Sequence, residues 1–264
     1  MKKLFASILL LAPTILFGQV ALQGTWRTDM DQAKLSQKPY TFSLAGGMYE
    51  CTSCVPEIKI KADGTDQPVT GQTYDTLSAR MDGPRTITLT AKKNGKTVFE
   101  QTRTVSVDGN TLALKSTSYS KENDQSVQTE VSLTRVGQTP SGANGTSGSW
   151  RVNKVSETDA GLMTTYKWAG DELIMSQPTG EGYRAKLDGH DYPYNGSYTI
   201  DTVSLKRIDD RTIEETNKRG GKVISISKIS VSPDGKTLTE VVNNKLLDRT
   251  STFVSEKQTM EAEK

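Results

Sequence analysis

The chain has 264 residues, of which 34% are hydrophobic and 6% aromatic, and its 33 basic residues nearly balance its 31 acidic ones. A chain so close to neutral has no broad cationic field for phosphates, so nucleic acid and anionic membrane surfaces are poor candidate partners. The low hydrophobic fraction fits sheets with one polar face and argues against a parallel sheet that is buried on both faces.

The first residues are typical of a secretory signal. Lys2 and Lys3 supply a positive start, and residues 4–17 are nearly all apolar. This run is shorter than the ~20 residues that a membrane-spanning helix needs. We therefore predict a signal peptide over residues 1–19, export to the periplasm or the extracellular space, and no membrane span in the mature protein. A buried N-terminal strand is the alternative interpretation.

The remainder of the chain is one unit used twice. Segment 61–71 returns as segment 186–196, and Asp75 then matches Asp201 in a register that holds as far as Leu112. This repetition predicts two domains, each long enough to bury one core. The expected boundaries are repeat 1 over 22–136, a flexible linker over 137–147, repeat 2 over 148–258 and a polar tail over 259–264.

Short alternating segments separated by turns indicate an all-β fold. Residues 40–44 and 57–61 alternate apolar and polar side chains, as half-buried strands do. Asn94-Gly95 is a strong two-residue hairpin signal. Eight or nine such strands per repeat form an antiparallel meander, and closing it into a barrel removes the unpaired edges. We predict two tandem antiparallel meander β-barrels, with an open sandwich as the alternative and a helical turn or a loop over 29–38.

Each repeat opens with the same short motif, Gly-x-Trp, which contains Trp26 in the first copy and Trp150 in the second. The motif resembles the one that opens the first strand of lipocalins, members of the calycin-like barrels. The resemblance implies that each tryptophan closes one barrel end beneath a basic side chain from the last strand. Arg135 and Lys257 stand where that side chain is expected, and a desolvated cation over an indole face gains up to ~2 kcal/mol.

The likeness departs from typical lipocalins in three respects, since each copy is shorter, aromatic residues are few, and no clear helix follows the barrel. The whole mature chain is also similar to exported bacterial proteins of unknown function that contain Gly-Thr-Trp-type units. The segments that carry this second likeness are Asp188–Pro193 and Lys206–Thr212. No activity follows from either likeness.

Cys51 and Cys54 are the only cysteines, and repeat 2 has no counterpart for them. In an oxidising compartment this pair predicts a local disulfide that clamps a strand end. A redox-active pair is an alternative, although no helix follows to lower a thiol pKa. Zinc needs two more ligands, and the only histidine, His190, aligns with Thr65. We predict no metal and no cofactor.

Two Asp-Gly-x-Asp segments have carboxylates at a spacing found in calcium loops. They contain Asp63 and Asp66 in repeat 1 and Asp188 and Asp191 in repeat 2. Calcium needs more oxygen ligands than these segments offer. A turn in which the first aspartate caps its own backbone explains the same residues, and this is the interpretation that we favour.

No pattern in the chain predicts catalysis. Glu214 and Glu215 align with Thr88 and Leu89 of repeat 1, so they do not form an acid–base pair shared by the repeats. No serine lies in a nucleophile-elbow pattern, and no metal-binding helix motif occurs. We therefore expect no catalytic residue and a protein that is not an enzyme.

Tyr192, Tyr194 and Tyr198 form the densest aromatic cluster. They are weak candidates for ligand-binding residues at a barrel mouth, and ordinary loop packing is the interpretation that we favour. The function that the sequence favours is an exported binding protein whose barrels hold a small apolar or amphipathic ligand. The alternatives are a cell-envelope structural or protein-interaction module with filled cores and an envelope protein as partner, and a thiol oxidoreductase.

Overall fold

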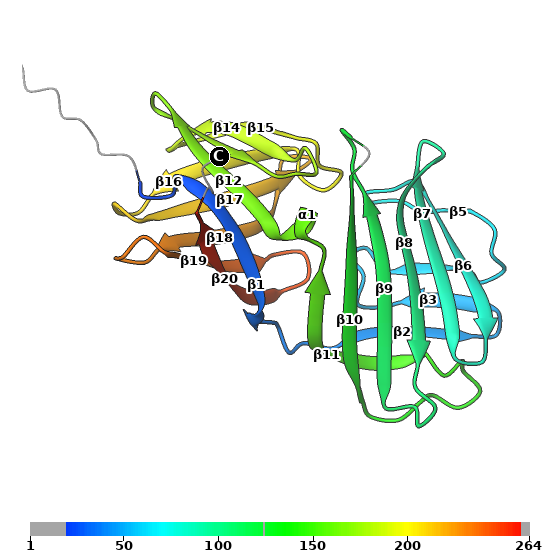
Figure 1. Cartoon of the computed structure of the whole chain (residues 1–264). Coiled ribbons are helices and arrows are strands. Elements are labelled where there is room, and N and C mark those ends of the chain that lie inside the picture. Colours follow the sequence, from blue (N-terminus) through cyan, green and yellow to red (C-terminus); the bar gives the residue numbers. More distant parts are fainter. Residues whose placement is uncertain (1–19, 124, 260–264) are drawn as a thin grey trace, which may run out of the picture.

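The computed structural model describes residues 20–123 and 125–259, and over these residues the chain is all-β, with twenty strands and one four-residue helix (Figure 1). The predicted signal peptide and nearly all of the predicted polar tail lie outside the described residues. No helix in the described part of the chain is long and apolar enough to span a membrane.

The strands follow one another in two similar series. The first series is β1 (Gly24–Lys34), β2 (Tyr40–Ala45), β3 (Met48–Cys51), β4 (Ile58–Lys61), β5 (Gln67–Pro68), β6 (Thr76–Gly83), β7 (Thr86–Lys93), β8 (Lys96–Val105), β9 (Thr111–Tyr119) and β10 (Ser126–Val136). The second is β11 (Gly148–Glu157), α1 (Asp159–Leu162), β12 (Met163–Ala169), β13 (Glu172–Ser176), β14 (Gly182–Lys186), β15 (Asp188–Asn195), β16 (Thr202–Arg207), β17 (Thr212–Arg219), β18 (Lys222–Val231), β19 (Thr237–Asn244) and β20 (Arg249–Gln258).

The strands form two antiparallel barrels of ten strands each, which confirms the predicted fold class and adds one or two strands per barrel. The closed barrel has the order β1-β12-β13-β14-β15-β16-β17-β18-β19-β20. The open barrel has the order β4-β3-β2-β11-β10-β9-β8-β7-β6-β5. A bridge between Asp63, two residues after β4, and Arg80 of β6 links the two ends of this sheet. Each barrel encloses its own cluster of buried apolar side chains.

The two repeats exchange their first strands. β1 pairs with β12 and β20 of the second series, whereas β11 pairs with β2 and β10 of the first. Figure 1 shows β1, in blue, lying beside β12 and β20, away from β2 and β3. The open barrel is therefore one continuous segment, β2 to β11, whereas the closed barrel combines β1 with β12–β20. The expected boundaries at residues 136 and 148 do not separate the two barrels.

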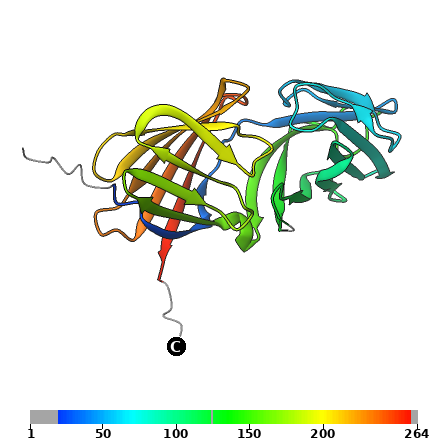
Figure 2. The same cartoon turned by 90° about the horizontal axis from the view of Figure 1, so that it is seen from above.

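The connections explain the exchange. Both repeats present equivalent strand edges to a first strand, so exchanging the two first strands preserves the type of pairing. β1 continues to Lys34, where a helical turn or loop was expected over 29–38, and residues 35–39 then carry the chain to the other barrel. Figure 2 shows this blue segment crossing between the barrels. Pro39 stiffens the crossing, because its ring fixes φ and removes an N–H donor.

The two tryptophans close one end of each barrel, and the exchange sets their partners. Trp26 lies in the closed barrel with Lys257 Nζ 5.3 Å from its ring centroid, and Trp150 lies in the open barrel with Arg135 Cζ at 4.0 Å. Each cation thus comes from the last strand of the repeat that does not contain its tryptophan. Each indole N–H donates to a carbonyl four residues earlier, that of Leu22 for Trp26 at 2.8 Å and that of Thr146 for Trp150 at 2.9 Å.

The glycine of each Gly-x-Trp motif is required by this geometry. Gly24 and Gly148 adopt φ of 139° and 128°, which favours glycine. A Cβ on Gly24 would lie 2.5 Å from Lys257 Cε, and one on Gly148 would lie 2.8 Å from Arg135 Nη1. The motif therefore combines a buried tryptophan ring with a glycine whose missing side chain leaves room for the cation.

The end of the expected linker is part of the open barrel's plug. Thr146 and Ser147 are completely buried. The Arg135 guanidinium donates to the carbonyl oxygens of Ser147 at 2.7 Å and Gly145 at 2.6 Å. A charged donor that binds backbone carbonyls orders the segment that carries them, so residues 145–147 are held in place although the segment 137–147 contains no large apolar side chain.

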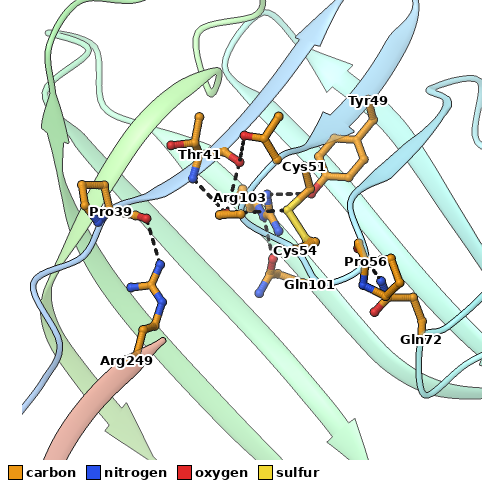
Figure 3. Close-up of a disulfide and its surroundings, with 12 residues drawn as sticks. Pro39, Thr41, Tyr49, Cys51, Cys54, Pro56, Gln72, Gln101, Arg103 and Arg249 are labelled. Carbon is orange, nitrogen blue, oxygen red and sulfur yellow. Dashed lines mark hydrogen bonds between the residues drawn. A yellow bond between two sulfur atoms is a disulfide. The ribbon is translucent and has the colours of Figure 1, made fainter. Parts of the chain in front are cut away.

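Arg249 of β20 holds the crossing segment against the closed barrel. Its guanidinium donates to the carbonyl oxygens of Lys38 and Pro39 and lies 3.8 Å from the centroid of the Tyr40 ring (Figure 3). The residue is only 8% exposed. This contact ties the last strand of one barrel to the entry strand of the other.

We expect Arg249→Ala to lower the free energy of unfolding by about 2–3 kcal/mol, because two charge-assisted hydrogen bonds and a cation–π contact are lost. Lys38→Ala is the matched control, since the Lys38 side chain makes only exposed contacts, an ion pair with Asp248 and a hydrogen bond to the Leu247 carbonyl, both at 3.2 Å. Such pairs contribute less than ~1 kcal/mol. Denaturant unfolding measures both variants, and equal losses would contradict a clamp at Arg249.

Candidate functional site

A cavity of about 340 Å³ lies at the mouth of the closed barrel. Successive inward positions along β1 lead to it, from Trp26 at the plugged end through Thr28 to Met30. We call this cavity the mouth pocket. Its walls come from β1, the crossing segment, β11, α1, β19 and β20, and its lining residues are Thr28, Met30, Leu35, Val155, Glu157, Gly161, Leu162, Glu240 and Phe253.

Two carboxylates line the mouth pocket, and Glu240 of β19 is the one that belongs to the closed barrel. Burial disfavours its charged form, and the nearby Glu215 carboxylate adds repulsion, so the pKa of Glu240 is raised to about 7. A hydrogen bond from Ser227, which is almost fully buried, acts in the opposite direction. The pocket therefore contains a carboxyl group that exchanges its proton near neutral pH.

A buried polar network extends behind Glu240. Tyr183 Oη donates to Glu215 Oε2 at 2.7 Å, and Asn217 Nδ2 donates to Glu215 Oε1 at 3.0 Å. Glu215 and Asn217 are both 6% exposed, and burial raises the pKa of Glu215. The buried Asn217 Oδ1 accepts no hydrogen bond. The network thus leaves one buried acceptor, Asn217 Oδ1, without a donor.

Glu157, at the end of β11, is the second carboxylate of the mouth pocket. Its Oε1 accepts a hydrogen bond from Thr129 Oγ1 at 3.0 Å, and burial raises its pKa. Gly161 of α1 leaves room for it, since a Cβ there would lie 2.6 Å from Glu157 Cδ and 2.7 Å from Val127 Cγ1. The strand exchange delivers this carboxylate, because β11 belongs to the other barrel.

The open barrel carries different side chains at the corresponding positions. Glu215 aligns with Leu89, and Glu240 aligns with Leu114. The strand pairing agrees with this alignment, because Leu114 lies opposite Arg103 and Glu240 lies opposite Ile229, the residue that aligns with Arg103. Leu89 is buried and Leu114 packs against the open-barrel core. The fold therefore tolerates leucine at both positions, and the carboxylates are not needed to form a barrel. Comparing the repeats position by position is the sequence signal that finds them.

The structure does not gather the three predicted tyrosines into one site. Tyr194 is buried inside the closed barrel, with its ring centroid 5.8 Å from that of Tyr183. Tyr192 packs on the same core, and its hydroxyl donates to Asp188 Oδ2 at 2.8 Å. Tyr198 packs against the core of the open barrel. None of the three lines the mouth pocket.

Cys51 and Cys54 form a disulfide that fastens the end of β3 (Figure 3). The loop between them is also held by Ser53, whose N–H donates to the carbonyl of Thr41 at 3.3 Å. Thr41 N–H in turn donates to Ser53 Oγ at 2.9 Å. The disulfide therefore closes a loop onto β2, as the predicted strand clamp requires.

Arg103 is the cation of the open-barrel interior. Its Cζ lies 4.1 Å from the Phe42 ring centroid, Nη1 donates to Tyr49 Oη at 3.1 Å, and Nε donates to Gln101 Oε1 at 2.6 Å (Figure 3). Within residues 20–123 and 125–259 it makes no ion pair with a carboxylate. The two barrel interiors thus contain different ionisable side chains, Arg103 in the open barrel and Glu215 and Glu240 in the closed barrel.

The two Asp-Gly-x-Asp segments adopt the favoured turns. Asp63 Oδ1 accepts from Thr65 N–H at 2.9 Å, and Asp188 Oδ1 accepts from His190 N–H at 2.9 Å. These bonds stabilise the carboxylate, and the pKa of Asp188 falls to about 2. Among the described residues, no three His, Cys, Asp or Glu side chains converge as metal ligands do.

No protein-family model, curated protein or solved structure matches this chain.

Proposed function

We propose that this protein binds one small amphipathic molecule in the mouth pocket of the closed barrel. The observation that carries the proposal is a cavity whose walls are largely apolar, from Met30, Leu35, Val155, Leu162 and Phe253, and which also contains two carboxyl groups. Apolar walls with a few placed polar groups are typical of small-molecule sites. At ~30 Å³ per water-sized group, its volume accommodates about ten non-hydrogen atoms.

The divergence of the repeats supports assigning the binding role to the closed barrel. The open barrel has leucine at the positions of both interior glutamates, and its interior contains a large apolar cluster that includes Trp150 and Tyr49. A mainly apolar core suits a structural role for that barrel. The Cys51–Cys54 disulfide supports export, because such bonds persist in oxidising compartments. We propose a lipocalin-like barrel pair that acts outside the cytoplasm without catalysing a reaction.

Calorimetric titration with three eight-carbon probes, n-octanol, n-octylamine and n-octanoate, tests the binding role. We expect at least one probe to bind with one molecule per chain. Met30→Trp fills the pocket and is expected to weaken that binding at least tenfold. Val107→Trp adds the same side chain at a position that is 88% exposed, and it is expected to change nothing.

Two results would overturn the binding role: no probe binds, or Met30→Trp binds as tightly as the wild type. Circular dichroism of each variant establishes that the barrels are intact. The titrations use the full mature chain, since the pocket needs residues from both repeats.

A further inference from the structure

The mouth pocket is short of positive charge. None of its described lining residues is Lys, Arg or His, and neither Glu157 nor Glu240 forms an ion pair within residues 20–123 and 125–259. Glu157 and Glu240 are both half-buried, and a carboxylate that loses part of its hydration without gaining a cation is destabilised. A ligand that brings a positive charge into the pocket supplies the missing partner.

The network behind the pocket has the same imbalance. Glu215 accepts from Tyr183 and Asn217, and Asn217 Oδ1 stays buried without a donor although the residue is more than nine-tenths buried. Each buried acceptor without a donor costs about 1–3 kcal/mol. A group with several N–H donors offsets such costs, whereas a carboxylate or an ether oxygen adds further acceptors.

The walls indicate an organic cation and not a metal ion. Calcium takes about six to eight oxygen ligands, and no three potential ligands converge in the part of the chain that the structure describes. Met30, Leu162 and Phe253 instead offer apolar surface next to the carboxyl groups. An alkyl or aryl chain that ends in an amine matches both features.

We propose that the mouth pocket selects amphiphiles whose polar end is a protonated amine, with the ammonium facing Glu157 and Glu240 and the apolar chain against Met30, Leu162 and Phe253. This inference rests on the proposed binding role, which it narrows to one class of ligand. The fold does not impose the carboxylate of β19, because the equivalent position of the other barrel is Leu114.

Titration with the same three probes distinguishes the binding role of the pocket from its preference for amines. We expect wild-type protein to bind n-octylamine at least tenfold more tightly than n-octanol, and n-octanoate most weakly. Glu240→Leu, which copies Leu114, is expected to reduce the preference for amine over alcohol to about twofold while octanol affinity is kept. Glu157→Gln provides a second variant. Glu214→Gln is the control: Glu214 precedes Glu215 on β17 and points to the opposite face of the sheet, so this variant is expected to leave the preference unchanged.

The affinity for the amine is also expected to depend on pH. An alkylamine stays protonated between about pH 6 and pH 8, since amines of this type titrate near ~10.4. Glu240 must ionise to attract it, and its pKa is raised to about 7. Octylamine affinity is therefore expected to rise about tenfold from about pH 6 to pH 8. Of the groups that face Glu240, Glu215 and Glu157 have pKa values raised in the same direction, and burial keeps Tyr166 and Tyr194 neutral.

Each outcome decides one statement. Equal or tighter binding of octanol or octanoate overturns the amine preference and leaves the binding role standing. If the preference for amine over alcohol survives both Glu240→Leu and Glu157→Gln, the proposal is also overturned, because other residues would then bind the ammonium group. Failure of all three probes removes the binding role itself.

Discussion

Trp26→Ala is expected to destabilise the C-terminal part of the chain although the residue lies near the N-terminus. Trp26 is 1% exposed and plugs the closed barrel, which consists of β1 and β12–β20. Truncating a buried tryptophan costs about 3–5 kcal/mol, and the loss of the Lys257 contact adds to it. Hydrogen–deuterium exchange should therefore become faster over residues 163–258 and stay unchanged over residues 40–136.

Trp150→Ala is the mirror control for this experiment. Trp150 is completely buried in the open barrel, so its truncation should speed exchange over residues 40–136 and spare residues 163–258. Trp26→Phe keeps an aromatic plug and should have a smaller effect. If each substitution instead speeded hydrogen–deuterium exchange within the repeat that contains the substituted tryptophan, each first strand would belong to the barrel of its own repeat.

Glu240→Gln is expected to raise stability above neutral pH. The pKa of Glu240 rises from an ordinary 4.5 to about 7 on folding. Between these pH values the folded chain holds a proton that the unfolded chain has released, so stability falls as pH rises toward 7 and stays low above it. At ~1.4 kcal/mol per pKa unit, the difference amounts to at most about 3 kcal/mol. Glutamine stays neutral and avoids this loss.

The measurement is the free energy of unfolding of both proteins from about pH 3.5, one unit below the ordinary pKa of the side chain, to about pH 8.5. The two curves should meet at the acid end, where Glu240 is protonated in both states, and separate as pH rises, with the variant more stable. Glu256→Gln, at an exposed position of β20, should follow the wild type at every pH. A constant offset between the Glu240→Gln and wild-type curves would contradict a titrating carboxyl at this position.

Local chemistry made the turns and the cysteine bond predictable. Asn94 and Gly95 both adopt positive φ, 51° and 77°, as the Asn-Gly hairpin signal requires. Cys51 and Cys54 are three residues apart and form the expected disulfide. Such features depend on neighbours in the chain, so one sequence contains nearly all the information that they need.

The candidate site was harder to predict because its carboxylates are distant from one another in sequence. Glu157, Glu215 and Glu240 come from three different strands, and nothing near any of them indicates a shared interior. The tyrosines of 192–198 show the same effect, because Tyr192 and Tyr194 pack on the closed-barrel core whereas Tyr198, only four residues further on, packs on the open-barrel core.

The sequence by itself determined that one hairpin-built unit occurs twice and that the chain forms two antiparallel barrels. Period-two alternation, turn residues and the Gly-x-Trp motif are all local and suffice for this. Only the tertiary structure decided which barrel each first strand completes, because both repeats offer equivalent edges and local preference cannot choose between them. That choice brings β1, β11 and the crossing segment together at one barrel mouth, and with them the pocket and its two carboxyl groups.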